Sequence, residues 1–461
     1  MSSTSPAASL HKAEFRITAA LSSVFALRMF GLFLLLPVFT LYGDTLAGST
    51  PFLIGTAIGA YGLMQALLQI PFGMLSDRFG RRPLILVGLV FFIAGGAVAA
   101  LSDHIYGVIL GRALQGAGAI ASVVMALISD SVSDTRRTRA MALIGMSVGG
   151  TFVLALILGP LMAKSLGLSG LFWTTTVMGV VAFGVTLRWV PAVRARHSRA
   201  AMRSPLSLRR LLIHPDLSRL NMSIFSLHLV MTATFVVLPL VLKETAGLAL
   251  PSHSMLYLGV MVGGVALMVP LIIYAERRAV RPVMVAGIAL LILAEVMLAA
   301  APGQLWWYVV ALLAFFTAFN LLEALLPSLV GRAVPAGTRG AAMGVYSTSQ
   351  FMGVFIGGQL GGFMLGYSGP RGAFWVCAGL LVIWAIVACS FRELRRLESR
   401  VLVLTETGPV ADRWLEGVLA LEGVVEGLIV AEDHIAIIKL DPALMDEDRL
   451  KQTLGGVARV E

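Results

Sequence analysis

The chain contains twelve apolar runs, each long enough to cross a lipid bilayer. A helix needs about 20 apolar residues to span a hydrocarbon core of about 30 Å. Of the 461 residues, 58% are hydrophobic and only 13% are charged, and the mean hydropathy is +0.88. A water-soluble globule of this length cannot bury so much apolar surface. We therefore predict an all-α polytopic membrane protein with twelve transmembrane helices.

The predicted spans fall into two sets of six. The first set covers residues 18–42, 52–75, 84–102, 105–128, 139–163 and 168–190. The second set covers residues 219–242, 252–275, 282–301, 305–330, 340–365 and 372–392. The first run is too long for the core of a signal peptide and lacks a convincing cleavage site, so we interpret it as a retained span.

Basic residues are distributed unevenly between the loops. Of the 30 Lys and Arg in residues 1–400, 25 lie in the N-terminus, in alternate loops or after the last span, and three lie in the opposite loops. Cytoplasmic loops carry such an excess, so we expect both termini in the cytoplasm. We expect no nucleic-acid partner, because aromatic residues that would stack on bases are not interleaved with the arginines.

Two stretches lie outside the predicted spans. Residues 191–218 are polar and rich in arginine, and we predict a basic cytoplasmic linker there, between six-helix bundles at 1–190 and 219–396. Residues 397–461 form a tail that carries 12 acidic and 5 basic residues from position 401 onward. Strands predicted at 401–404, 424–430, 435–440 and 457–460 are interleaved with helices at 411–421 and 446–454. This βαββαβ order predicts a small α/β domain with a ferredoxin-like fold.

Two sequence matches indicate that the halves are duplicated. Residues 77–83 align with 276–282 at an offset of 199, and residues 139–142 align with 339–342 at an offset of 200. Parallel halves of this kind surround a central site that opens alternately to the two sides of the membrane. We therefore predict two pseudo-symmetric bundles.

Two motifs carry a family resemblance. Residues 73–82 read Gly-Met-Leu-Ser-Asp-Arg-Phe-Gly-Arg-Arg and resemble motif A of the major facilitator superfamily. Residues 112–118 read Arg-Ala-Leu-Gln-Gly-Ala-Gly and are similar to motif B of its proton-coupled drug exporters. The resemblance covers residues 15–395 and implies the fold of this superfamily.

The same resemblance implies a function. We expect a secondary transporter of the bacterial inner membrane that exports a small amphipathic drug or metabolite in exchange for protons, by alternating access. It implies no cofactor besides the proton gradient, no metal, and a tail that regulates transport or self-associates. One motif departs from the pattern. Gly159 and Pro160 on span 5 are followed by Met162 and Ala163 where antiporters have glycines, which leaves the direction of transport open.

Motif A also has a physical interpretation. Gly73 and Gly80 permit a tight turn and close helix approach. Asp77 can interact with the N-terminus of a neighbouring helix, where the macrodipole favours an anion, and Arg81 can pair with Asp130 across spans. With Arg78, these residues form a predicted gating set that stabilises one conformation. The alternative is a positively charged membrane anchor with no gating role.

Ionisable residues inside the spans are candidates for proton coupling. A charge at the bilayer centre costs about 2.5–3.5 kcal/mol on insertion scales, so it normally faces a cavity or a partner. The candidates are Arg28, Arg112, His228, Glu295 and Glu323, with Asn320 three residues before Glu323 on the same helix face. We expect Glu323 and His228 to bind and release the proton, because removal from water disfavours the charged form of both. The resemblance implies that Arg112 takes part. The alternatives are a permanent Arg28–Glu323 pair and, for Glu295, a lipid-shielded hydrogen bond.

A polar stripe is predicted to line the substrate cavity. Tyr61, Gln65 and Gln69 follow one another at i, i+4 and i+8, and Gln350 on span 11 can contribute from the other half. The alternative for all four is hydrogen bonding between helices.

Two other functions stay open from the sequence. One is proton-coupled uptake of a sugar or small metabolite, and the other is a membrane sensor that signals through its tail. An enzyme is disfavoured, because no nucleophile–base pair, metal-ligand cluster or phosphate-binding loop stands out.

Overall fold

The computed structural model describes residues 6–132, 134–192, 214–277, 280–334, 339–391, 398–404, 408–430, 435–441, 444–454 and 458–460. Most of the predicted linker, at 193–213, and the hairpin turn at 431–434 lie outside this set. The chain divides into two compact units, Met1–Pro327 with Gly340–Phe391 and Ser328–Arg339 with Arg392–Glu461.

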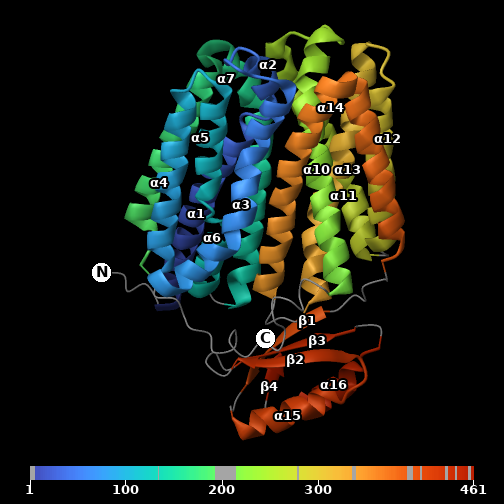
Figure 1. Ribbon diagram of the computed structural model, residues 1–461. Coiled ribbons are helices and arrows are strands. Elements are labelled where there is room, and N and C mark those ends of the chain that lie inside the picture. The colour runs from blue at the N-terminus through green and yellow to red at the C-terminus, as the bar shows by residue number, and fades with distance from the viewer. Residues whose placement is uncertain are drawn as a thin grey trace. The chain divides into compact units, whose positions relative to one another are not determined.

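The first unit is built from long helices that run alongside one another (Figure 1). The N-terminal half contains α1 (Pro6–Phe33), α2 (Phe39–Gly43), α3 (Pro51–Phe79), α4 (Arg81–Ala100), α5 (Ile105–Ala117), α6 (Ala121–Ser131) and α7 (Asp134–Trp189). The C-terminal half contains α10 (Pro215–Glu244), α11 (Leu250–Arg277), α12 (Val280–Ala299), α13 (Leu305–Ala333) and α14 (Arg339–Cys389).

Ten helical segments in the described part of the chain are long and apolar enough to cross a membrane. Two of them, in α7 and α14, run for 47 and 50 residues, far more than one crossing needs. Each contains a glycine outside helical geometry, Gly167 with φ 66° and Gly369 with φ 70°. A side chain disfavours this left-handed region, so the glycines are suited to these turns. Each glycine divides its helix in two, and the described segments then number twelve.

Two predicted spans contain breaks that the apolar pattern does not reveal. In the span predicted at 18–42, α1 ends at Phe33 and five turn residues precede α2. Pro37 lies in this break, where it lacks an N–H and its ring would clash with the preceding turn of a helix. In the span predicted at 105–128, Ala119 and Ile120 donate their backbone N–H groups to carbonyls only two residues back. The helical ladder is therefore interrupted between α5 and α6.

The duplication predicted from the sequence recurs in local geometry. Gly167 and Gly369, 202 positions apart, have nearly the same backbone conformation. Arg82 at the start of α4 donates to a carbonyl at the end of α7, and Arg281 at the start of α12 donates to the carbonyl of Cys389 at the end of α14. The same contact is therefore made at corresponding places in both halves.

The tail contains β1 (Glu398–Leu404), α15 (Pro409–Leu419), β2 (Val424–Val430), β3 (Ile435–Leu440), α16 (Glu447–Leu454) and β4 (Ala458–Val460). The strands form an antiparallel sheet in the order β2-β3-β1-β4. Alternate residues of the strands, such as Leu402, Ala436 and Ile438, pack against Trp414 and Val418 of α15. This small core explains why the elements form at the predicted places.

Candidate functional site

The two helical halves meet along glycines of α3 and α14. A β-carbon at Gly59 would lie 2.8 Å from the carbonyl oxygen of Phe355, and one at Gly62 would lie 2.7 Å from that of Phe351. Both distances are shorter than van der Waals contact. We call the glycines of this contact, Gly55, Gly59 and Gly62 on α3 with Gly358 and Gly362 on α14, the glycine seam. Thr56 beside it donates a hydrogen bond of 3.2 Å to Gln359.

The seam covers the part of α3 from Pro51 to Gly62. A second contact between the halves involves the start of α11, where Ser254 donates a 2.6 Å hydrogen bond to the carbonyl of Ile157 on α7. Pro51 and Leu250 occupy corresponding places at the beginning of the second predicted span of each half. The halves are therefore closed against each other at the Pro51 end of α3.

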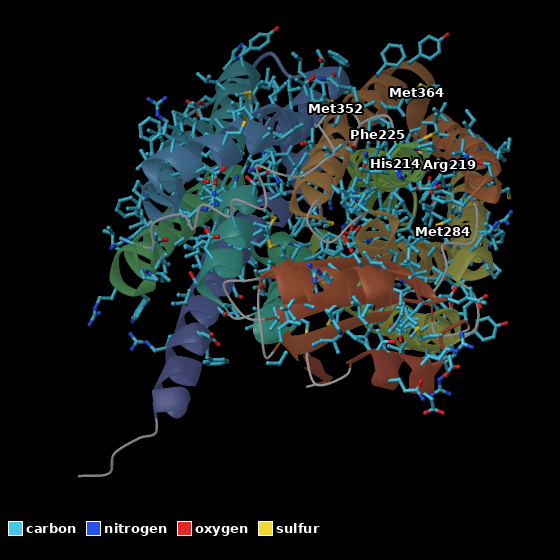
Figure 2. All side chains as sticks on the ribbon, turned by 90° about the horizontal axis from the view of Figure 1, so that it is seen from below. His214, Arg219, Phe225, Met284, Met352 and Met364 are labelled. Atoms are coloured by element: carbon cyan, nitrogen blue, oxygen red, sulfur yellow. The ribbon has the colours of Figure 1, made fainter. Side chains whose placement is uncertain are left out.

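Glycines also bring α14 close to α10 within the C-terminal half. Figure 2 views the helices end-on and labels Phe225 of α10 and Met352 of α14. A β-carbon on Gly361 would lie 2.8 Å from the carbonyl oxygen of Ala233, and one on Gly353 or Gly357 would lie even closer to an α10 carbonyl oxygen. This packing positions the next residues of α14 against α10.

Three polar side chains of the C-terminal half form one hydrogen-bonded group. Gln350 of α14 donates to Glu323 Oε1 of α13 at 3.4 Å, and its Nε2 lies 2.8 Å from His228 Nε2 of α10. His228 Nδ1 lies 3.3 Å from the carbonyl of Ile224. Because an amide nitrogen is only a donor, this arrangement fits the neutral His228 tautomer that carries its proton on Nδ1. His228 Nε2 also lies 3.8 Å from Glu323 Oε2.

Several polar atoms around this group have no hydrogen-bond partner. They are Glu323 Oε2, Asn320 Nδ2 and the hydroxyl of Tyr346. Asn320 lies one turn before Glu323 on α13, as the sequence predicts. Buried polar groups are normally satisfied, and the Glu323 side chain is still 37% exposed. The C-terminal half thus offers unused donors and an unused carboxylate oxygen to a proton, water or solute.

A second polar group lies in the N-terminal half and contains two arginines. The guanidinium carbons of Arg28 on α1 and Arg112 on α5 lie 5.6 and 5.1 Å from the centre of the Tyr61 ring. Arg112 donates to Gln115 at 3.0 Å, and the Gln65 amide oxygen accepts from Arg28 in the orientation that satisfies both groups. The two arginines are only 1% and 2% exposed.

The two polar groups lie on either side of an aromatic contact. The ring of Tyr61 on α3 is 6.5 Å from that of Phe351 on α14, and Phe351 directly follows Gln350. This contact is at the inner end of the glycine seam, because Gly62 meets the Phe351 carbonyl. The alternative Arg28–Glu323 pair is not among the ion pairs of the described residues.

The predicted cavity stripe of α3 lies inside the N-terminal half in this structure. Tyr61 and Gln65 are fully buried and Gln69 is 3% exposed. The backbone carbonyl of Gln69 accepts a hydrogen bond from Ser122 of α6. Gln350 is the only member of the predicted substrate-cavity set that contacts Glu323.

Motif A centres on Arg81 at the start of α4. Arg81 contacts Asp77 at 2.5 Å and Asp130 of α6 at 3.0 Å, and it donates to Ser76 at 2.5 Å. The Arg81–Asp130 contact predicted across spans is therefore present. The side chains of Arg81 and Asp130 are 9% and 14% exposed, whereas that of Asp77 is 62% exposed. The interaction of Asp77 with a helix N-terminus is not present here, because Asp77 pairs with Arg81 instead.

The remaining motif A residues fit the turn around Arg81. Gly80 has φ 94°, a conformation that favours glycine. A β-carbon on Gly73 would lie 3.4 Å from the Ser122 hydroxyl, an ordinary contact distance, so the approach of α3 and α6 at this position does not require glycine. Arg78 lies over the ring of Phe79, 5.4 Å from its centre.

Some residues of these groups were not singled out by the sequence analysis. Gln115 connects Arg112 to Thr175 of α7 through a 3.0 Å hydrogen bond, and its spacing of three residues from Arg112 was a usable signal. Tyr346 lies one turn before Gln350, which is a similar signal. Nothing in the sequence marks Phe351.

Glu295 of α12, which the sequence analysis named as an ionisable candidate, is fully buried and accepts a 2.6 Å hydrogen bond from Thr234.

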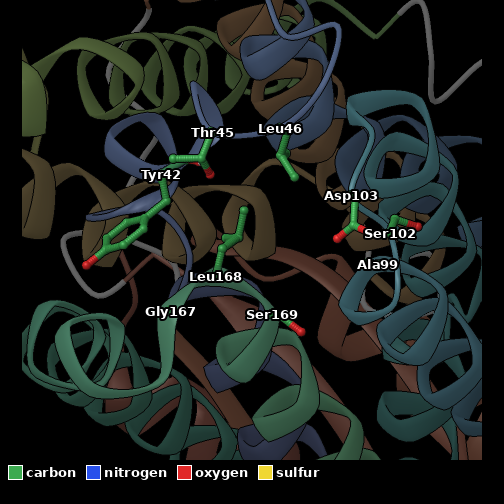
Figure 3. A pocket seen from close by; sticks show the side chains of 9 residues that line it. All are labelled: Tyr42, Thr45, Leu46, Ala99, Ser102, Asp103, Gly167, Leu168 and Ser169. Carbon is green, nitrogen blue, oxygen red and sulfur yellow. The ribbon is translucent and has the colours of Figure 1, made fainter.

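A separate cavity of about 300 Å³ lies near α2 (Figure 3). Its lining residues are Tyr42, Thr45, Leu46, Ala99, Ser102, Asp103, Gly167, Leu168 and Ser169. None of the predicted site residues borders it. The hydroxyls of Thr45, Ser102 and Ser169 already donate to backbone carbonyls. This cavity therefore offers a ligand few free polar groups.

Comparison with known proteins gives consistent matches. Residues 21–275 and 220–430 match the profile of the Major Facilitator Superfamily. The chain is 44% identical over 444 residues to the inner membrane transport protein YajR of Escherichia coli strain K12, which covers 96% of this chain and 97% of that protein. It is 32% identical over 139 residues to the class B tetracycline resistance protein of Escherichia coli, covering 29% and 34% of the two chains.

The fold also matches a solved structure. The crystal structure of a D-xylose-proton symporter superimposes with a TM-score of 0.66 and 16% identity, covering 82% of this chain and 98% of that one. At this identity the likeness shows the fold alone. The profile match, the extensive identity to YajR and the shared fold agree with one another, and the chain belongs to the Major Facilitator Superfamily of multi-pass membrane transporters.

Proposed function

We propose that this protein exports a small amphipathic solute in exchange for protons, with Glu323 as the proton-carrying group. The observation that carries the proposal is the Glu323–Gln350–His228 group, with one unused carboxylate oxygen, beside the contact between the halves. The name of the tetracycline resistance protein among the relatives favours export of such a solute.

The proposed proton transfer involves three neighbouring side chains, Glu323, Gln350 and His228. Gln350 holds Glu323 through one oxygen and leaves the other free to take a proton. His228 Nε2 lies 3.8 Å from that second oxygen and accepts from Gln350, so a proton can pass from Glu323 to His228 once Gln350 releases this nitrogen and water bridges the gap. Asn320 and Tyr346 supply the unused hydrogen-bonding groups for the solute.

The two ends of the helical unit differ in a way that fits alternating access. The glycine seam closes the Pro51 end of α3, and the motif A end carries Asp77 with a 62% exposed side chain. We interpret this as a state open on the motif A side, which the positive-inside pattern assigns to the cytoplasm. In the opposite state Asp77 would leave Arg81 for a helix N-terminus and hold the motif A end closed.

The tail completes the proposed organisation. Its element order and its sheet order β2-β3-β1-β4 agree with a ferredoxin-like fold. We assign it a regulatory role, because its net negative charge is opposite to that of the basic loops. The predicted boundaries at 190, 218 and 396 remain part of this proposal.

The test is driven transport by reconstituted protein. A ligand-stabilisation screen on the detergent-purified chain supplies the solute, and vesicles then measure its movement with and without a pH gradient. Glu323→Gln should abolish movement against the solute gradient and preserve solute–solute exchange, because a neutral amide cannot release a proton. Glu295→Gln is the matched control and should retain both activities, since Glu295 bonds to Thr234.

Other outcomes separate the remaining functions. Driven transport by Glu323→Gln would overturn the carboxylate assignment. Accumulation under the opposite proton gradient would identify an importer. Solute binding without any translocation by the wild-type protein would identify a sensor.

A further inference from the structure

The two arginines of the N-terminal half are buried cations without a counter-ion among the residues that the structure describes. Arg28 and Arg112 are 1% and 2% exposed. No carboxylate of the described residues lies within ion-pair distance of either guanidinium. An uncompensated charge in a low-dielectric interior is strongly destabilising, whether in a soluble core or within a bilayer.

The neighbouring groups solvate the arginines only in part. Arg28 has the Gln65 amide oxygen and the faces of Tyr61 and Phe92, and its Nε has no partner at all. Arg112 has the Gln115 oxygen and a long, 3.4 Å contact from its Nε to the Ala57 carbonyl. Amide oxygens and ring faces supply partial charges, so two full positive charges remain without a negative one.

We propose that the N-terminal half binds a monovalent anion beside Tyr61, held mainly by the unpartnered Nε edge of Arg28 and by the field of Arg112. The shared chemistry is a small, singly charged acceptor, either a free halide or the carboxylate of a solute. A guanidinium edge suits both, because it presents parallel N–H donors. This proposal is independent of the direction of transport, because it concerns binding alone.

The groups around Arg28 hold its guanidinium in a fixed position. Gln65 and Tyr61 fix the guanidinium from one side through an amide and a ring, and Phe92 contacts it from α4. Gln115 is itself held by Thr175 of α7, so Arg112 is oriented as well. Donors that are fixed before the ligand arrives lose little freedom on binding. Corresponding positions of the halves also differ, since the residue 200 positions after Arg28 is His228, which can be neutral.

The experiment measures the thermal stability of the purified full-length chain in detergent. Sodium chloride replaces sodium sulfate, a divalent anion, at constant ionic strength, and in a second arm sodium benzoate or neutral benzamide is added to the sulfate buffer. We expect a saturable rise in Tm of roughly 2 °C or more with the anion that binds, and no rise with benzamide. A chloride response identifies a free ion, and a benzoate response without a chloride response identifies the acidic group of a solute.

Variants assign the response to Arg28. Arg28→Met should lose the anion response and, in the sulfate buffer, should be at least as stable as the wild type, because the uncompensated charge is gone. The exposed Arg188 provides the matched control, and Arg188→Met should respond like the wild type. Should Arg28→Met fail to fold, Arg28→Lys should respond with at least tenfold weaker half-saturation, and a bromide soak of wild-type crystals should give an anomalous peak beside Arg28.

Three results would contradict the proposed anion site. If neither chloride nor benzoate raises Tm, or if benzamide acts as well as benzoate, the anion site does not exist. An unchanged response in Arg28→Met would also overturn it. These results leave the transport function intact, since they do not involve Glu323, and loss of proton-driven flux would in turn leave the anion site intact.

Discussion

At the scale of single residues, burial separates the two ion pairs of Arg81. The side chains of Asp130 and Arg81 are both largely buried, whereas the side chain of Asp77, the other partner of Arg81, is mostly exposed to solvent. A solvent-exposed pair contributes little to stability, but removal of one partner from a buried pair leaves a charge without compensation. The same arginine therefore has a structural partner and a partner that it can release.

This difference predicts unequal effects of two similar substitutions. Asp130→Asn should lower the free energy of unfolding by about 2 kcal/mol or more, and Asp77→Asn by less than about 1 kcal/mol. Denaturation of the purified variants in detergent measures both. Equal losses would show that the two carboxylates support Arg81 in the same way.

Asp77 has a separate prediction that concerns conformation. If Asp77 holds the motif A end closed in the opposite state, Asp77→Asn should increase the population of the state described here. Accessibility labelling of single cysteines at the two ends of the helical unit measures this shift. Asp77→Asn with unaltered labelling at both ends would reject the gating role.

At the scale of elements, the glycine seam sets how closely the halves approach. A β-carbon on Gly358 would lie 2.5 Å from the Gly55 carbonyl oxygen, so a larger residue cannot be accommodated while the seam is closed. The sequence does not identify which helix each of these glycines faces. That information depends on how α3 and α14 are brought together, which local patterns do not encode.

The seam gives a prediction with an internal control. Gly358→Val should force α3 and α14 apart and favour the state that is open at the Pro51 end. Gly379→Ala, in the segment of α14 that follows the turn at Gly369, has nothing within 4 Å of the new β-carbon and should leave the equilibrium unchanged. Labelling of a cysteine near Pro51 should rise several-fold in Gly358→Val alone, and equal labelling of the two variants would contradict the account.

Some features of the elements could be predicted from the sequence and others could not. Apolar runs and loop charges predict the membrane helices and the duplication, because each depends on the bilayer or on the chain itself. The break at Pro37 and the interruption at Gly118–Ile120 were not predicted, since both stretches are as apolar as their surroundings. Likewise, the sequence places Glu323 and His228 in spans, but the Gln350 side chain that joins them comes from a third helix.

At the scale of the whole molecule, two similar halves differ in the chemistry they contribute. The N-terminal half holds two buried arginines and no described carboxylate near them, and the C-terminal half holds Glu323 with His228. The halves share the turn at Gly167 and Gly369, but the N-terminal half is interrupted between α1 and α2 and between α5 and α6, where α10 and α13 are continuous. They therefore differ in local backbone as well as in side chains. Rocking of such halves moves two unlike polar surfaces relative to each other.

The tail has its own prediction at this scale. Deletion of residues 397–461 should change the transport rate at low ionic strength, and the difference from the full chain should disappear as salt is added. The reason is that interactions between an acidic tail and basic loops are screened beyond about 10 Å at 0.1 M salt. Identical rates with and without the tail at every ionic strength would exclude an electrostatic regulatory role.

If Glu323 carries the proton, its protonation should set which end of the transporter is open, and this dependence can be measured without knowing the solute. Spin labels at Phe52 of α3 and Phe363 of α14, with the exposed Cys389 replaced by alanine, report the separation of the halves at the Pro51 end. We predict two distances whose proportions change with pH in the wild-type protein, and a Glu323→Gln variant fixed at the acidic proportions at every pH. A wild-type protein that ignores pH, or a variant that still follows it, would contradict the account.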